Sequence, residues 1–202
     1  MERGKLIVVE GIDGCGKDTQ IDLIYSYMLM QGMRVMKRSN ISDLASGKYL
    51  RKILSDTNLK LNNFELAKLF ITELIEVSSE IDILLEEGIN VVCSRWFYST
   101  LAYAGTTDEE YVYIQKLISE SNLLNPDLTI YLNVTPSTAM ERINSRGENK
   151  EIYEEIDKLS LIHERYYKVF SDMINKAEPN LRVFLADDSI DTVFTKIKKH
   201  II

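Results

Sequence analysis

The chain has 202 residues, of which 45% are hydrophobic and 27% charged, and its formal net charge is −7. This composition is typical of a folded globular protein, and no apolar run approaches membrane-spanning length, so we expect no membrane association. The negative charge disfavours nucleic acid as a partner, although a single nucleotide needs only a local cluster of cations.

The start of the chain and its cysteines bear on the compartment. The first apolar run begins at Lys5, so we expect no signal peptide before the fold. The two cysteines, Cys15 and Cys93, suit a reducing environment better than a disulfide framework. We therefore expect a cytoplasmic protein.

Apolar or β-branched runs alternate with helical patterns along the chain. The predicted strands span residues 5–10, 34–38, 89–93, 128–134 and 182–186. The predicted helices span residues 17–30, 44–54, 64–86, 109–121, 137–145, 151–176 and 191–201. Such alternation predicts an α/β fold with a parallel five-stranded sheet covered by helices on both faces. Because no linker or repeat interrupts the pattern, we expect residues 1–202 to form one domain.

A glycine-rich turn joins the first predicted strand to the first predicted helix. Its sequence is Gly11-Ile12-Asp13-Gly14-Cys15-Gly16-Lys17. In this context successive backbone N–H groups and the positive end of the helix converge on one anion, and the lysine adds a mobile charge. Glycine lets the loop turn tightly and approach phosphate oxygens. The alternative is a chance glycine-rich turn; the strand–loop–helix order favours a P-loop that binds a nucleotide phosphate.

Two arginines follow predicted strands, at the edge of the sheet where ligands bind in such folds. Arg95 follows the third predicted strand and Arg38 ends the second. A guanidinium group matches two phosphate oxygens at once, so Arg95 is a candidate for holding a second phosphate. A salt bridge at the end of the strand is the alternative for Arg95. For Arg38, a weaker candidate, a solvated side chain is about as plausible.

A polar run over residues 142–154 is the candidate lid. It contains Arg142, Arg146 and Lys150 around Gly147. Lids of this kind bring cations onto a transferring phosphate and exclude water as they close. A charged surface loop is the alternative.

Three segments together resemble one protein family. The first is Glu10–Lys17 followed by Thr19-Gln20, and the second is 88–103, which contains Ser94-Arg95-Trp96, Ser99 and Ala102-Tyr103. The third is 125–134, with Pro126-Asp127, before a helix that carries Arg142 and Arg146-Gly147. These motifs resemble the thymidylate kinases, a family of P-loop nucleoside monophosphate kinases, and the likeness spans nearly the whole chain. The chain is identified as a divergent member.

The resemblance implies a transferase that moves the γ-phosphate of ATP to dTMP, giving ADP and dTDP, with Mg²⁺ as cofactor. It also implies a homodimer formed through apolar helices. The implied ATP-binding residues are Gly11, Ile12, Asp13, Gly14, Cys15, Gly16, Lys17, Asp18 and Thr19. The implied catalytic residues are Lys17, Arg95 and Arg146. The implied acceptor-binding residues are Asp13, Arg38, Phe70, Arg95, Ser99 and Tyr103.

The resemblance also assigns roles within the acceptor site. Asp13 matches an acid that meets the sugar 3′-hydroxyl, and Tyr103 matches a tyrosine that disfavours a 2′-hydroxyl. Phe70 matches an aromatic residue that stacks on the base. For the two aromatic residues, a place in the helix core is the alternative. Because the P-loop lacks the arginine found in some relatives, the lid must supply it, and Arg146 is the candidate.

Four departures from the family pattern lie at working positions. Asp18 stands where a hydroxyl residue holds Mg²⁺, and Ser94 replaces an acid that organises metal and water. We predict that Asp18 takes over part of the metal-holding role lost at Ser94. Leu74 and Ala104 replace an arginine and a glutamine that contact the base, which should relax or change base choice.

Two other readings remain open at this stage. One is a nucleotide-binding sensor or partner protein with weak catalysis, which the four departures would explain. The other is a kinase for a different nucleotide acceptor. A panel of nucleoside monophosphates, assayed with ATP and Mg²⁺, separates these readings.

Overall fold

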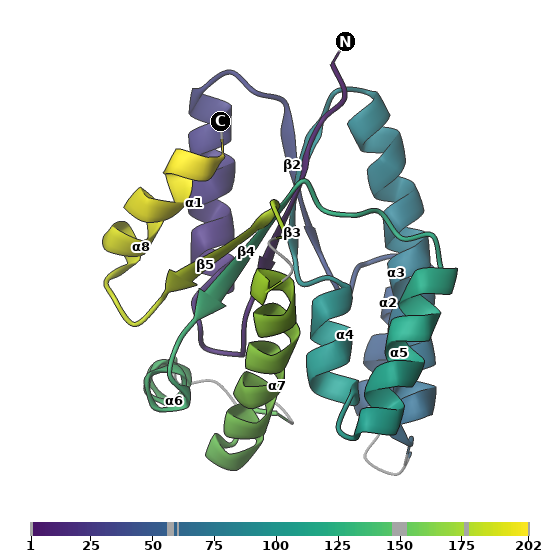
Figure 1. The fold of residues 1–202 in the computed structure, drawn as a ribbon. Helices are drawn as coiled ribbons and strands as arrows, with labels where there is room; N and C mark the ends of the chain where they lie inside the picture. The colour runs from purple at the N-terminus through teal and green to yellow at the C-terminus, as the bar shows by residue number, and fades with distance from the viewer. Residues whose placement is uncertain (1, 56–58, 60, 147–152, 176–177, 202) are drawn as a thin grey trace.

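The computed structural model describes residues 2–55, 59, 61–146, 153–175 and 178–201. Within these ranges a five-stranded sheet has the order β2-β3-β1-β4-β5, and every neighbouring pair is parallel. The strands are β1 (Leu6–Glu10), β2 (Val35–Ser39), β3 (Asn90–Ser94), β4 (Leu128–Asn133) and β5 (Leu181–Leu185). The predicted α/β class is confirmed (Figure 1).

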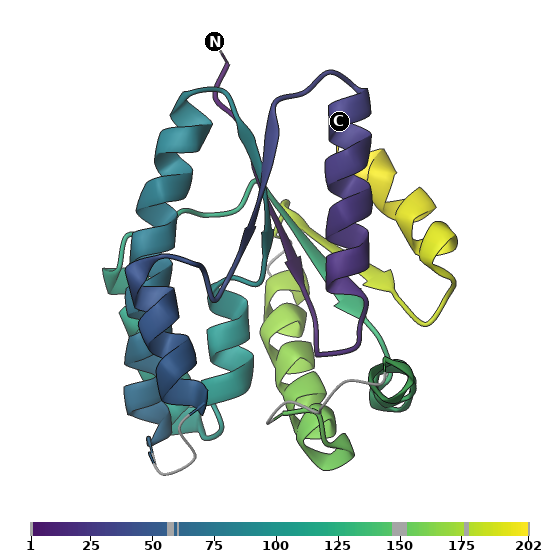
Figure 2. The ribbon, with the colours of Figure 1, turned by 180° about the vertical axis from the view of Figure 1, so that it is seen from behind.

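Helices cover both faces of this sheet and make three layers (Figures 1 and 2). The α1 and α8 helices pack on one face, whereas α3, α4 and α7 cover the other. The helices are α1 (Lys17–Met30), α2 (Ala45–Ser55), α3 (Asn63–Glu86), α4 (Phe97–Ala104), α5 (Asp108–Glu120), α6 (Pro136–Ser145), α7 (Ile156–Asn175) and α8 (Ile190–Ile197), with a 3₁₀ turn at Lys198–His200. No helix in the described ranges is long and apolar enough to span a bilayer.

The central strand β1 positions the site. All of its residues are buried between the two helix layers, as expected for a parallel strand covered on both faces. Val9 pairs with Ser94 of β3, and the amide of Arg95 donates to the carbonyl of Val9 at 3.0 Å. The turn after β1 and the residue after β3 therefore leave the sheet side by side, at its carboxyl edge.

Two elements differ from the sequence prediction. Helix α4 is not among the predicted helices, because seven of its eight residues are buried and it shows no polar face. Helix α7 begins at Ile156 rather than at residue 151, because residues 153–155 form a turn and bend instead. Residues 151–152 lie outside the described part of the chain.

Candidate active site

The turn after β1 has the backbone geometry of an anion cradle. Gly14 and Gly16 adopt left-handed conformations, with φ of 78° and 93°. A Cβ on Gly14 would lie 2.4 Å from the carbonyl oxygen of Ala139, whereas one on Gly16 would meet no atom of the described residues within 4 Å. Gly16 is also the N-cap of α1, so no side chain caps the amides of the first turn. The residues of this first turn, Lys17, Asp18 and Thr19, line an open cavity, as an anion site requires.

Lys17 is held inside this loop. Its side chain is 7% exposed, and Nζ donates to the carbonyl oxygens of Gly11 and Ile12 at 3.1 and 2.9 Å. Nζ also lies 3.8 Å from Oδ1 of Asp13. The loop opens into a cavity of about 420 Å³, the phosphate cavity, lined by Asp13, Gly14, Gly16, Lys17, Asp18, Thr19, Ser94, Arg95, Arg146 and Glu154.

Arg95 connects the sheet edge to the P-loop. Its φ is 66°, a left-handed conformation that costs a residue with a Cβ about 1 to 2 kcal/mol. The guanidinium Nη1 donates to the carbonyl of Gly11 at 3.2 Å and to the hydroxyls of Ser99 and Tyr166 at 3.3 and 3.1 Å. Strained backbone at the end of a strand, with its side chain fixed by several partners, is typical of a functional position.

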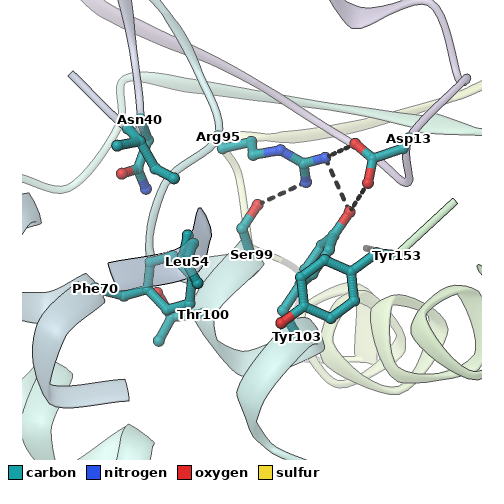
Figure 3. Close-up of a pocket in the computed structure, with 10 residues that line it drawn as sticks. Asp13, Asn40, Leu54, Phe70, Arg95, Ser99, Thr100, Tyr103 and Tyr153 are labelled. Carbon is teal, nitrogen blue, oxygen red and sulfur yellow. Dashed lines mark hydrogen bonds and ion pairs between the residues drawn. The ribbon is translucent and has the colours of Figure 1, made fainter. Parts of the chain in front are cut away.

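The second terminal nitrogen of this guanidinium, Nη2, contacts the two residues matched to the sugar (Figure 3). Nη2 of Arg95 forms an ion pair with Oδ1 of Asp13 and donates to the hydroxyl of Tyr103 at 2.9 Å. Burial would raise the pKa of the Asp13 carboxyl, but the charges of Arg95 and Lys17 outweigh it and lower that pKa to about 2. Burial raises the pKa of Tyr103 well above its ordinary value. Near pH 7, Asp13 is therefore an anion and Tyr103 a neutral donor.

Glu10, the last residue of β1, anchors the start of α4 beneath Arg95. Its Oε1 accepts from the amide of Trp96 at 2.7 Å. Its Oε2 accepts from the hydroxyls of Ser99 and Tyr166 at 2.7 and 2.8 Å. Burial raises the pKa of Glu10, with the charge of Arg95 opposing the shift. The sequence analysis assigned Glu10 no role of its own, although an acidic residue at the end of an apolar strand is a signal that could have been used. Tyr166 lies 71 residues from Arg95 in the sequence, and no local pattern indicates that it belongs to the site.

A second cavity, of about 210 Å³, lies beside Arg95 and is called the acceptor cavity here (Figure 3). It is lined by Asp13, Asn40, Ile41, Leu54, Phe70, Arg95, Ser99, Thr100, Tyr103 and Tyr153. The ring of Tyr153 meets that of Tyr103 edge to face, with centroids 5.0 Å apart. The sequence did not single out Asn40, Thr100 or Tyr153.

The structure does not bring every candidate to this cavity. Arg38 pairs with Glu80 at 2.8 Å and lines a separate hollow. Leu74 and Ala104 are fully buried and are not among the lining residues. The candidates brought together at the acceptor cavity are Asp13, Phe70, Arg95, Ser99 and Tyr103.

Two candidate lid residues, Arg142 and Arg146, also lie beside the P-loop, and Arg146 lines the phosphate cavity as well. Arg142 and Arg146 line a third cavity, of about 600 Å³, together with Gly14, Thr19 and Ile190. Nη2 of Arg142 donates to the carbonyl of Ala186 at 2.8 Å, which fixes this side chain. Nη1 of Arg146 lies 3.6 Å from Oε1 of Glu154. Lys150 lies outside the described residues.

The phosphate cavity offers oxygen ligands that suit Mg²⁺. Asp18 is exposed there, and the hydroxyl residues Thr19 and Ser94 line the same space. The described residues contain no cluster of three or more His, Cys, Asp or Glu side chains able to hold a metal. This donor set fits an ion bound by one protein carboxylate, with phosphate oxygens and water completing its shell, as Mg²⁺ commonly is.

Comparison with known proteins agrees with this geometry. A family model described as thymidylate kinase matches residues 9–197. The chain is 35% identical over 165 residues to a thymidylate kinase of Leptospira interrogans serovar copenhageni, covering 81% of this chain and 80% of that protein. It is 31% identical over 206 residues to a thymidylate kinase of Rickettsia africae, covering 100% of this chain and 98% of that protein.

Proposed function

We propose that this chain, which belongs to the thymidylate kinase family, transfers the γ-phosphate of ATP to dTMP and releases ADP and dTDP. The observation that carries the proposal is that Asp13 and Arg95 line both the phosphate cavity and the acceptor cavity. Two cavities that share a cation and an acid at their junction suit two phosphate groups brought end to end. This arrangement also favours the kinase over a sensor with weak catalysis.

Positioning and charge supply most of the catalysis in such a transfer. The bond between the γ-phosphorus and its bridging oxygen breaks, while an oxygen of the acceptor phosphate bonds to the same phosphorus. The P-loop amides and Lys17 hold the donor phosphates, and Arg146 approaches the transferring group from the lid side. Mg²⁺ held beside Asp18 would neutralise charge on the donor phosphates.

The acceptor residues divide the nucleotide among them. Arg95 is placed to hold the acceptor phosphate, because its guanidinium lies between the two cavities. Asp13 and Tyr103 form the polar side of the acceptor cavity and suit the sugar. Phe70 offers an aromatic face to a planar base.

The proposal is tested by an assay that couples ADP release to a readout, with ATP, Mg²⁺ and one monophosphate at a time. We expect turnover with dTMP to exceed that with dCMP, dGMP and dAMP. ADP release with none of them would overturn the kinase assignment. Turnover highest on another monophosphate would keep the reaction class and change the substrate.

The quaternary state is a separate part of the proposal. We infer a homodimer, supported by two exposed apolar residues of α3, Ile75 and Ile83, which are 43% and 63% exposed. Sizing chromatography with light scattering measures the mass, and a monomer across the accessible concentrations would contradict this inference.

A further inference from the structure

One residue that lines the acceptor cavity, Asn40, carries a polar atom to which no described residue forms a hydrogen bond. Asn40 and Ile41, between β2 and α2, form one wall of this cavity together with Leu54. Oδ1 of Asn40 is buried and has no hydrogen-bond partner among the residues that the structure describes. The hydroxyl oxygen of Thr100, on α4, is likewise buried and has no hydrogen-bond partner among the described residues. Buried polar atoms are normally paired, so two such atoms on residues that line one cavity indicate polar atoms of a ligand.

The protein holds this wall in place by contacts from three directions. The amide of Asn40 donates to the carbonyl of Ser94 at 3.0 Å. The amide of Ser42 donates to Oε1 of Glu73 on α3 at 2.8 Å, and Nη1 of Arg51 donates to the carbonyl of Ile41 at 2.9 Å. Glu73 is fully buried, an unusual place for a carboxylate unless it serves a specific contact. The backbone on both sides of the Asn40 side chain is therefore fixed.

The position of Asn40 within the cavity selects which part of an acceptor it can meet (Figure 3). Asn40 lies on the side of Leu54 and Phe70, away from Asp13 and Tyr103. Charged and hydroxyl groups gather at the Asp13 end, which suits the phosphate and sugar. The Phe70 end is largely apolar and suits a planar base, whose polar edge then needs a partner on the wall.

We propose that the carboxamide of Asn40 reads the polar edge of the acceptor base and that Glu73 is the positioning residue that holds Asn40 in register. A carboxamide presents a donor beside an acceptor, which matches the N3–H and O4 groups of thymine. Base selection thus depends on the wall formed by Asn40, Ile41 and Leu54, because the buried side chains of Leu74 and Ala104 offer no polar group. The inference rests on the proposed function and adds its specificity residue.

The test compares three acceptors, dTMP, dUMP and dCMP, in the wild type and in two variants of one residue. Asn40→Ala should lower kcat/KM for dTMP and dUMP by about fivefold to tenfold through the KM of the acceptor, with the KM for ATP unchanged. The dTMP-to-dUMP ratio should stay constant, because both bases share the same imide edge. Asn40→Asp, which only accepts, should raise the dCMP-to-dTMP ratio, because the cytosine amino group donates.

The outcomes separate this inference from the function it rests on. An equal change in kcat/KM for all three acceptors would mean that Asn40 contacts the phosphate or the sugar. No change in kcat/KM would mean that Asn40 does not contact the acceptor. Either result overturns the inference, whereas dTMP turnover by the wild type still supports the proposed kinase function. Absence of turnover by the wild type with every acceptor overturns both.

The positioning role of Glu73 needs a conservative variant. Glu73→Gln keeps the length of the side chain and an oxygen for the Ser42 amide, so it should keep the wild-type base ratios. Glu73→Leu should lower kcat/KM for dTMP and dUMP in the same way as Asn40→Ala, which raises the dCMP-to-dTMP ratio. Glu80→Gln, on the same face of α3, is the matched control and should change no ratio. Wild-type base ratios in Glu73→Leu, or altered base ratios in Glu73→Gln, would overturn the positioning role of Glu73. If Glu73→Leu does not fold, the Asn40 variants still test whether Asn40 contacts the base.

Discussion

The hydroxyl of Tyr103 donates a hydrogen bond to Oδ2 of Asp13 at 2.9 Å, across 90 positions of the sequence. The same hydroxyl accepts from Nη2 of Arg95 at 2.9 Å, and Arg95 closes the triangle through its ion pair with Asp13. Each of these side chains is thus oriented by the other two. A site preorganised in this way loses little rotational freedom when a substrate enters.

Two variants of Tyr103 separate the work of its ring from that of its hydroxyl. If the ring excludes a 2′-hydroxyl by occupying space, Tyr103→Ala should reduce the preference for dTMP over its ribonucleotide by about tenfold. Tyr103→Phe keeps the ring and should keep that preference, although it loses the bond to Asp13. Competition assays with the two acceptors measure the ratio. A loss of preference in Tyr103→Phe would assign the discrimination to the hydroxyl instead.

The lowered pKa of Asp13 predicts a pH-dependent contribution to folding. Its carboxyl titrates at about 2 in the fold and near 3.8 ordinarily, so the ionised form stabilises the native state above about pH 4. Asp13→Asn should cost about 2 kcal/mol of unfolding free energy near pH 6, and the difference should shrink as the pH falls from about 4 towards 2. Urea unfolding at several pH values measures it. Asp157→Asn, at an exposed position, is the control, and a cost independent of pH would contradict the prediction.

The sequence predicts the P-loop and the strand-end arginine because both are encoded locally. A buried strand, a glycine turn and a helix start are adjacent in the chain, and Arg95 directly follows its strand. Each predicted strand lies within one residue of the observed bounds at either end. Chemistry that depends on neighbours in sequence is therefore readable without coordinates.

What the sequence could not supply is the set of partners that come from distant elements. Helix α4 carries Ser99, Thr100 and Tyr103, but it is buried on nearly every side, so its residues give no amphipathic period. Asn40 reaches the acceptor cavity only because β2 lies at the edge next to β3. The candidate Arg38 fails to reach it for a tertiary reason, since Glu80 on α3 holds its guanidinium elsewhere.

Two glycines of the P-loop predict opposite phenotypes. An alanine Cβ at Gly14 would lie 2.4 Å from a backbone oxygen of α6, so Gly14→Ala should lower the thermal unfolding temperature markedly. A Cβ at Gly16 meets no atom within 4 Å in the part of the chain that the structure describes, and it would point into the space offered to phosphate. Gly16→Ala should therefore weaken ATP binding more than it destabilises the fold, apart from about 1 to 2 kcal/mol of backbone strain. Calorimetric titration with ATP and thermal unfolding distinguish the two, and equal effects of both variants would contradict this reading.

Lys17 should matter to turnover far more than to folding. Lys17→Ala removes a positive charge from the phosphate cavity and should lower kcat by at least about a hundredfold, because this charge stabilises the negative charge that develops during phosphoryl transfer. Lys116→Ala removes the same charge from an exposed position on α5 and is the matched control. Circular dichroism checks that Lys17→Ala stays folded. A near-normal rate in that variant would remove Lys17 from the mechanism.

A variant of Asp18 tests whether this carboxylate on α1 takes over part of the metal-holding role of the acid that Ser94 replaces. Both residues line the phosphate cavity, and Asp18 is exposed, so its loss should leave stability nearly unchanged. If its oxygen ligates Mg²⁺ directly or through water, Asp18→Asn should weaken the Mg²⁺-dependent part of ATP binding by about tenfold. Calorimetric titrations of ATP at rising Mg²⁺ concentrations measure this dependence without relying on turnover.

The matched control removes the same charge one turn along the helix. Asp22 pairs with Lys37 at 2.6 Å and does not line the phosphate cavity. Asp22→Asn should therefore leave the Mg²⁺ dependence as it is in the wild type, because only long-range charge is lost and salt screens it. If both variants weaken ATP binding equally, the effect is one of net charge near the P-loop. If neither does, the metal is held without Asp18, and the exchange with Ser94 is wrong.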